Sequence, residues 1–274
     1  MPRRPRAATL APMTSPRRHW RAPHFDRINH EPVSWVYRTI AHLARNIVPL
    51  LGRTHWLGGE HIPKTGPVIV VANHIGNFDP IILGQYLIWQ GRWPRFLGKA
   101  DIWKVPGLGW VARQCGQIPV YRNTDRAGES LIHAEEALAE GKMVAIYPEG
   151  TITADPDGWP MTGRRGAARL ALTTGAPVVP VAQAGAELVL GGKHVDLRYL
   201  LRRRRDFHVV AGPPIDLSDY ADREVTGALL DEVASHMIDV LTTMRAELTG
   251  LTPPAGRYDM RQGRRVEIEA GPAE

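Results

Sequence analysis

Short apolar runs alternate along the chain with segments whose apolar residues recur every three or four positions. The runs at 67–72, 178–182 and 207–211 are continuous and rich in β-branched residues, which is typical of strands buried on both faces. Residues 130–140 and 222–247 instead place their apolar side chains at helical spacing. This alternation predicts an α/β fold, with a single mostly parallel or mixed sheet that helices cover on both sides.

The segment 33–51 predicts an amphipathic helix. Its apolar stripe consists of Val36, Ile40, Leu43, Ile47 and Leu50, and the opposite face carries Arg38, His42 and Arg45. The segment is too polar to span a bilayer, so it either packs on the core or lies at a membrane surface. Trp35 and Tyr37, at its start, would suit the level of the lipid headgroups. We therefore expect peripheral membrane attachment through residues 25–52.

The two ends of the chain differ in composition from the segments between them. Residues 1–24 are rich in proline and arginine, and we expect a disordered basic extension there. Residues 251–274 come after the helical segment 222–247. They contain Pro253-Pro254 and are rich in charged residues, so we expect a disordered tail there. The α/β domain is then assigned to residues 53–250.

His74 and Asp79 are the candidate catalytic pair. His74 comes two residues after the buried run 67–72, which places it at the carboxyl end of a strand, where open α/β sheets build their sites. Asp79 precedes Pro80 and an apolar segment, so we expect it to be the N-cap of a helix. An imidazole whose second nitrogen is held by a carboxylate can act as a general base. The same spacing also suits a capping aspartate beside a histidine in a turn.

Two further segments end short apolar strands with polar residues. Glu149, Gly150 and Thr151 follow the apolar run 143–146 and Pro148, and Arg122 follows the run 118–120. The planar guanidinium of an arginine suits phosphate. Taken singly, these segments are equally compatible with an ordinary turn and a solvated charge.

The three segments together, in this order, resemble the glycerolipid acyltransferase family. His74 to Asp79 matches the H-x-x-x-x-D motif, and residues 116–122 match the second, arginine-bearing motif. Residues 147–151 match the P-E-G-T motif, and residues 178–182 match the fourth. The likeness covers about residues 55 to 217, and four ordered motifs are far more specific than one. The family includes bacterial 1-acyl-glycerol-3-phosphate acyltransferases.

The resemblance implies transfer of a fatty acyl group from a thioester to a hydroxyl of a lysophospholipid. The donor would be acyl-CoA or acyl carrier protein, with no bound cofactor, no metal and no acyl-enzyme intermediate. His74 would be the general base and Asp79 would orient it. The residues implied for the acceptor site are Arg122, Glu149, Gly150 and Thr151. The backbone amides of Gly76 and Gly150 are candidates for stabilising the oxyanion.

One position departs from the family pattern. Members commonly carry an arginine directly after P-E-G-T, whereas this chain has Ile152, which cannot bind phosphate. The acceptor therefore differs from simple lysophosphatidate, or another cation takes the role. Arg164 and Arg165 are candidates because the family often has a lysine there, and Lys99 is a weaker one.

Composition agrees with an enzyme that works at an anionic surface. The formal net charge of +6 favours lipid headgroups or the phosphates of a donor, and no nucleic-acid module is recognisable. The single cysteine, Cys115, fits a reducing compartment. We expect a peripheral protein on the cytoplasmic side of the cell membrane.

Three alternatives remain open from the sequence. The first is an acyltransferase with a different glycerolipid or polar-lipid acceptor. The second is a metal-dependent hydrolase that uses His74, Asp79 and Glu149 as ligands, because imidazole and carboxylate groups bind divalent cations. The third is a non-catalytic lipid-binding protein that keeps the pocket without turnover.

Overall fold

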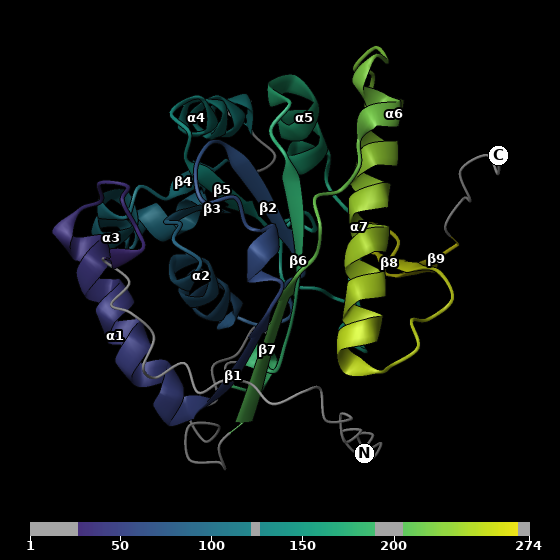
Figure 1. The fold of residues 1–274 in the computed structure, drawn as a ribbon. Coiled ribbons are helices and arrows are strands. Elements are labelled where there is room, and N and C mark those ends of the chain that lie inside the picture. Colours follow the sequence, from purple (N-terminus) through teal and green to yellow (C-terminus); the bar gives the residue numbers. More distant parts are fainter. Residues whose placement is uncertain (1–26, 122–126, 190–204, 268–274) are drawn as a thin grey trace.

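A seven-stranded sheet forms the centre of the molecule in the computed structural model, which describes residues 27–121, 127–189 and 205–267 (Figure 1). The strand order is β1-β7-β6-β2-β5-β3-β4. Every neighbouring pair is parallel except β6 and β7, which are antiparallel. This confirms the predicted α/β class with a mostly parallel sheet. The strands are β1 (Gly52–Leu57), β2 (Val68–Ala72), β3 (Pro94–Lys99), β4 (Ile118–Val120), β5 (Met143–Ile146), β6 (Val178–Ala184) and β7 (Arg205–Ala211).

Helices cover both faces of this sheet. One side carries α1 and α2 and the other carries α4, α5 and α7 (Figure 1). The helices are α1 (Trp35–Leu51), α2 (Asp79–Trp89), α3 (Leu108–Gln114), α4 (Ala127–Ala139), α5 (Arg165–Thr174), α6 (Ser218–Ala221) and α7 (Gly227–Thr249). Short 3₁₀ turns are η3 (Gly59–His61), η4 (Ala100–Lys104) and η5 (Ala186–Leu188). None of the helices in these ranges is both long and apolar enough to cross a membrane.

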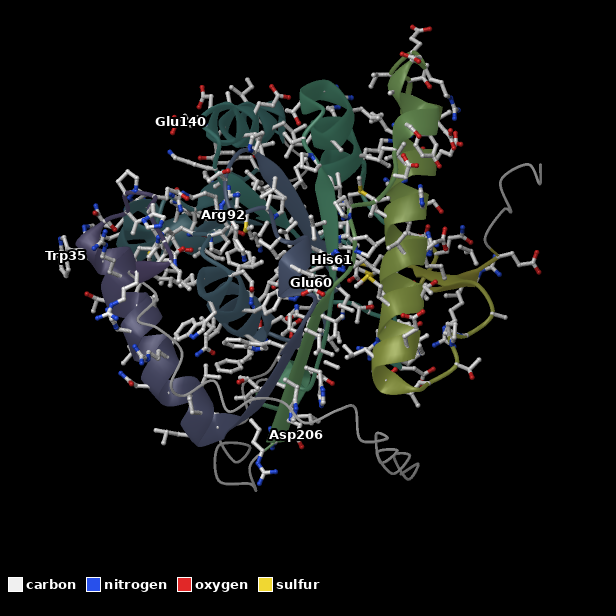
Figure 2. All side chains as sticks on the ribbon, viewed as in Figure 1. Trp35, Glu60, His61, Arg92, Glu140 and Asp206 are labelled. Carbon is white, nitrogen blue, oxygen red and sulfur yellow. The ribbon has the colours of Figure 1, made fainter. Side chains whose placement is uncertain are left out.

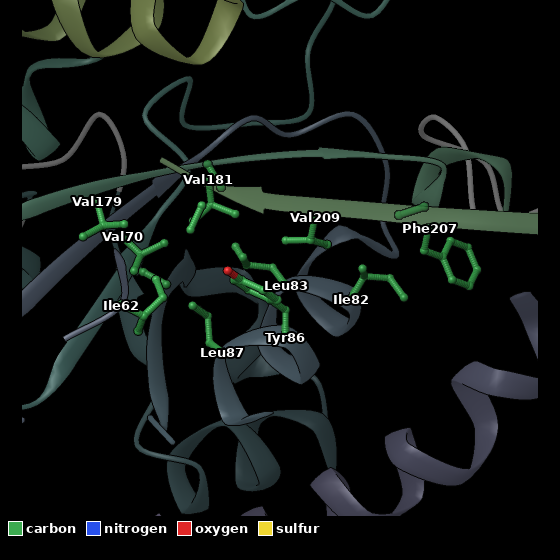
Figure 3. Close-up of a cluster of buried hydrophobic side chains, with 14 of the residues drawn as sticks. Ile62, Val70, Ile82, Leu83, Tyr86, Leu87, Val179, Val181, Phe207 and Val209 are labelled. Atoms are coloured by element: carbon green, nitrogen blue, oxygen red, sulfur yellow. The ribbon is translucent and has the colours of Figure 1, made fainter. Parts of the chain in front are cut away.

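Strand β2 shows why its sequence is continuously apolar. Successive side chains of a strand point to opposite faces, and both faces are covered here. Val68 and Val70 join the cluster under α2, whereas Ile69 and Val71 join the cluster under α5 and α7. Figure 3 shows the first cluster, with Tyr86 and its neighbours on α2 packed against valines of the strands. The order of the strands then decides where the site lies, because β2 and β5 are hydrogen-bonded neighbours whose carboxyl ends meet at one edge.

Helix α1 forms where the periodicity predicts it, but it is rotated relative to the predicted stripe. The buried residues are Val36, Tyr37, Ala41 and Val48, while Leu43, Ile47 and Leu50 of the predicted stripe are exposed. Tyr37 was expected at the headgroup level and instead packs 4.8 Å from the ring of Trp93, with its hydroxyl donating to Pro94 O at 2.7 Å. This contact turns the Tyr37 side of the helix inward, and Trp35 remains 70% exposed.

The carboxyl-terminal tail corrects a second prediction. Residues 251–274 were expected to be disordered, but β8 (Arg257–Asp259) and β9 (Arg264–Val266) form an antiparallel hairpin. Its charges are paired with α7 and with the loop before α5, which a charged sequence by itself does not reveal. Residues 1–26 and 268–274 lie outside the described residues, as does the predicted basic extension 1–24. The last long helix begins at Gly227 rather than near 222, because Thr226 caps it.

Candidate active site

His74 and Asp79 lie together in the loop between β2 and α2. The Nδ1 atom of His74 is 3.0 Å from Oδ2 of Asp79. The Asp79 side chain is fully buried and the His74 side chain is 15% exposed. A carboxylate in this position selects the tautomer that carries its proton on Nδ1. The Nε2 atom is then the nitrogen left to accept a proton from a substrate.

Asp79 does not cap its helix as predicted. Helix α2 begins at Asp79 itself, and Phe78 occupies the N-cap position. The carboxylate turns back into the preceding loop, where its Oδ2 accepts the backbone N–H groups of Ile75 at 2.5 Å and Gly76 at 2.8 Å. Asp79 therefore holds both the imidazole and the backbone that carries it.

The two glycine amides predicted for the oxyanion are already engaged. The N–H of Gly76 donates to Asp79, and the N–H of Gly150 donates to Tyr147 O at 2.9 Å. A backbone N–H that is committed to another acceptor is a poor donor for a charge that develops only in the transition state. These two glycines therefore do not supply the oxyanion donors in this conformation.

Tyr147 was missed by the sequence analysis. Its ring stacks on the imidazole of His74, with the centroids 4.0 Å apart and an angle of 18° between the planes. Burial raises the pKa of Tyr147 well above its ordinary value. The available signal was the alignment of β2 with β5, because Tyr147 directly follows β5 as His74 follows β2. The stack limits the rotation of the imidazole.

Glu149 occupies a different environment from the acceptor site that the resemblance implies. The side chain is buried, and its Oε1 accepts the backbone N–H of His74 at 2.9 Å. Its Oε2 accepts the backbone N–H of Met161 at 3.1 Å. Burial raises the pKa of Glu149 to about 8, although these two N–H groups oppose the shift. Glu149 therefore links two loops beneath the site.

A largely apolar pocket of about 580 Å³ opens beside His74. It lies between α1, α2 and α3, and Gly150, Thr151 and Ile152 line the end next to the imidazole. Apolar contributors from the three helices are Ile40, Ala44, Ile81, Ile88, Leu108 and Val111. Cys115 also lines it, and burial raises the pKa of this thiol to about 11, so it remains protonated at neutral pH.

The predicted cations are distributed unevenly around this pocket. Arg164 lines it and lies against Gly150, whose φ of 75° belongs to the left-handed region that favours glycine. Lys99 lines it too and pairs with Asp101 at 2.7 Å. Arg165 instead forms a two-pronged ion pair with Asp231 of α7, at 2.6 and 2.5 Å. Arg122 lies outside the described residues.

Within the described part of the chain, no three His, Cys, Asp or Glu side chains converge as metal ligands. His74 and Asp79 bond to each other, and both oxygens of Glu149 accept backbone N–H groups. Glu149, which the hydrolase alternative needs as a ligand, therefore has both oxygens engaged by the backbone.

Comparison with known proteins agrees with this geometry. The family model described as Acyltransferase matches residues 54–184. A 1-acyl-sn-glycerol-3-phosphate acyltransferase from Borreliella burgdorferi is 27% identical over 185 residues, which cover 66% of this chain and 70% of that protein. One of the same name from Bacillus subtilis is 26% identical over 188 residues, covering 68% and 85%.

A solved structure has the same fold. The 1-acyl-sn-glycerophosphate acyltransferase PlsC from Thermotoga maritima superimposes with a TM-score of 0.59 and 22% identity, covering 80% of this chain and 81% of that one. The matched segment 54–184 contains the dyad, the tyrosine that stacks on it and the pocket residues other than those of α1. Over residues 54–184 the chain is similar to the acyltransferase family.

Proposed function

We propose that this protein transfers a fatty acyl group from acyl-CoA or acyl carrier protein to the free hydroxyl of 1-acyl-glycerol-3-phosphate, giving phosphatidic acid. One observation carries the proposal. The Nδ1 atom of His74 is held by a buried carboxylate, and the ring lines an apolar pocket of about 580 Å³. A base beside an apolar pocket is what esterification of a lipid alcohol requires.

The reaction follows from the position of the two residues. The hydroxyl gives its proton to Nε2 of His74 while its oxygen attacks the carbonyl carbon of the thioester. The tetrahedral intermediate then expels the thiolate, which takes the proton from the imidazolium. Asp79 stabilises the imidazolium that forms between these steps. Such a base contributes about a hundredfold to ten-thousandfold, so positioning and stabilisation of the oxyanion supply the remainder.

The pocket between α1, α2 and α3 is the proposed site of the acyl chain. Its walls are aliphatic or aromatic along most of their length, and its end at residues 150–152 adjoins His74. Burial of a methylene group is worth about 0.8 kcal/mol, so a long chain gains its binding energy from such walls. The thioester carbonyl then lies at the imidazole.

Arg164 is the proposed cation for the acceptor phosphate, with Lys99 as a second. Both line the pocket that reaches His74. Arg165 is left out because its guanidinium pairs with Asp231. Glu149 is an acid that bonds two backbone N–H groups, so we assign it no contact with the phosphate. Ile152 lines the same pocket in place of the arginine common in the family, so a different glycerolipid acceptor is the alternative that the test must include.

Peripheral attachment to an anionic membrane on its cytoplasmic side completes the proposal. Trp35 of α1 projects outward (Figure 2), and its ring lies 6.4 Å from that of Trp110 on α3. We propose that the exposed apolar residues of the two helices form one membrane-facing surface around this contact, composed of Trp35, Leu43, Ile47, Leu50, Leu108 and Trp110. Leu108 also lines the pocket, so this surface adjoins it. Lipid substrates could then pass directly between the bilayer and the pocket.

The test is an acyl-transfer assay with a panel of acceptors and both donors. Purified protein is incubated with radiolabelled acyl-CoA or acyl carrier protein and with lysophosphatidate, glycerol-3-phosphate or other lysolipids. We expect the highest kcat/KM with lysophosphatidate. If only another lysolipid were acylated, the proposed acceptor would be wrong but the proposed acyl transfer would stand. Absence of transfer to every acceptor with both donors would refute the proposal.

A further inference from the structure

The β8–β9 hairpin lies far beyond the segment 54–184 that matches the family, yet it reaches the loop next to the catalytic histidine. We call residues 151–164, which lead into α5, the 151–164 loop. Thr162 N–H donates to Tyr258 O of the hairpin at 3.0 Å. Arg265 of β9 forms ion pairs with Asp155 and Asp157 of the same loop.

This loop is connected to both backbone groups of His74, directly to its C=O and through Glu149 to its N–H. The N–H of Thr153 donates to His74 O at 2.8 Å. The N–H of His74 donates to Glu149, whose other oxygen accepts Met161 N–H. The position of the imidazole therefore depends on where the loop holds Thr153 and Met161.

Asp155 organises the loop between those two points. Its Oδ1 accepts the N–H groups of Asp157 at 2.9 Å and Trp159 at 3.3 Å. Thr153 closes the turn, because its Oγ1 donates to Trp159 O at 2.7 Å. The Asp155 side chain is only 1% exposed, and an ionised carboxylate buried to that extent requires a partner.

Arg265 is that partner. Its Nε lies 2.7 Å from Oδ2 of Asp155 and its Nη2 lies 2.9 Å from Oδ1, with a further contact of 2.7 Å to Asp157. Burial alone would raise the pKa of Asp155, but Arg265 and the two N–H groups lower it below its usual value. A two-pronged pair of this kind fixes direction as well as charge.

The hairpin is itself anchored to the long helix α7. Arg257 of β8 is buried and donates to Ser235 at 3.0 Å, and it also pairs with Asp239. Arg245, also on α7, lies over the ring of Trp159 in the loop at 5.5 Å. Helix α7 therefore contacts the loop in two ways, directly through Arg245 and indirectly through the hairpin.

We propose that Arg265 is a positioning residue for His74, and this inference rests on the proposed acyl transfer. It acts through Asp155 and the Thr153 peptide, which hold the histidine backbone at the angle that directs Nε2 to the pocket. It touches neither substrate nor the imidazole.

The first experiment compares steady-state kinetics of Arg265→Ala with the wild type, using acyl-CoA and lysophosphatidate on vesicles. A misplacement of about 1 Å in the base can cost about a hundredfold, so we expect kcat to fall about tenfold to hundredfold with KM nearly unchanged. Arg265→Lys should recover part of the loss because it keeps the charge. Asp155→Asn should cost a similar factor, and combining it with Arg265→Ala should add little.

The matched control is Arg264→Ala. Arg264 neighbours Arg265 on the same strand, and its Nη2 donates to Oε1 of Gln262 at 3.1 Å within the hairpin. It should retain wild-type kcat. Equal kcat in Arg265→Ala and the wild type would overturn the inference, as would an equal loss in Arg264→Ala.

A second readout needs no turnover and so separates this inference from the proposed function. Hydrogen exchange at the Thr153 amide should accelerate about tenfold or more in Arg265→Ala, while exchange in β2 and β5 stays slow. The NMR chemical shifts of the His74 ring should change in the same variant. If the wild type lacks acyl transfer but these changes occur, the proposed function fails and the positioning role stands. Unchanged amide exchange and unchanged His74 ring shifts would overturn the role.

Discussion

The apolar pocket and the 151–164 loop both adjoin His74, but they are built from different interactions. The pocket walls come from three helices and make mainly non-directional contacts. The loop is a network of directed bonds, in which Glu149, Asp155 and Arg265 each satisfy more than one partner. Apolar walls tolerate changes of shape, whereas a buried polar network fails when one member is removed. Pocket substitutions should therefore change which acyl chain is used, and network substitutions should change the rate.

The dyad is the strongest test of this division. Asp79→Asn leaves the shape of the side chain nearly unchanged but favours the wrong tautomer of His74. It also weakens the hydrogen bonds that this side chain accepts from Ile75 and Gly76. We expect kcat to fall about a hundredfold to ten-thousandfold with no change in the preferred chain length. The control is Asp219→Asn, which alters an exposed acid of α6 that does not line the pocket. If Asp79→Asn changed the preferred acyl-chain length without lowering kcat, the division of roles between the pocket and the polar network would be contradicted.

Gly84 tests the pocket side. It lies on α2 and lines the pocket, and a Cβ there would meet Phe96 at 3.5 Å, which is ordinary contact. Gly84→Leu should lower kcat/KM for a long-chain donor about tenfold and spare a short-chain donor, because it fills volume without weakening the helix. Gly84→Ala should give a smaller change in the same direction. Equal losses with both donors would contradict the acyl-chain assignment.

The exposed aromatic pair tests how the pocket meets the membrane. Replacing Trp35 and Trp110 together with serine should weaken binding to anionic vesicles about tenfold and leave turnover of water-soluble short-chain substrates unchanged. Leu188 and Val225, which are also exposed but lie outside α1 and α3, provide the control pair. Vesicle co-sedimentation that is equal for the two double variants would show that this surface is not the anchor.

Glu149 gives the smallest and most specific prediction. Its folded pKa of about 8 exceeds the usual 4.5, so the folded state holds a proton that the unfolded chain releases. Its contribution to stability is present below the unfolded pKa and is lost as the pH rises through the folded one. Relative to the wild type, Glu149→Gln should therefore gain about 3 °C or more in Tm between pH 5.5 and 8.5. Glu247→Gln is the control, and a pH-independent difference in Tm would contradict the burial effect.

Much of the fold and of the dyad could be predicted because the signals are local. The continuous run of β2 reports burial on both faces, and five residues of spacing suffice to place His74 beside Asp79. The buried side of α1 was harder to predict, because apolar residues of this helix lie both in the interior and on the exposed surface. Leu43 and Val48 are equally apolar in sequence, yet one is exposed and the other is buried.

The polar side of the site depends on contacts that are distant in sequence. Arg265 and Asp155 are 110 residues apart, and an arginine in a charged tail has the same sequence pattern whether it is solvated or paired. The contacts of Glu149 could not be predicted for a related reason, since its partners are backbone N–H groups that carry no signature in the sequence. Tyr147 could have been found by aligning the ends of β2 and β5.

The most direct test of the central claim measures acyl transfer by His74→Ala on vesicles that contain lysophosphatidate. The account predicts that transfer falls about a hundredfold or more, because the variant lacks the base that accepts the proton of the hydroxyl. Folding and vesicle binding should remain, since the His74 ring is not part of either main core cluster. Transfer at the wild-type rate by folded, membrane-bound His74→Ala would contradict it.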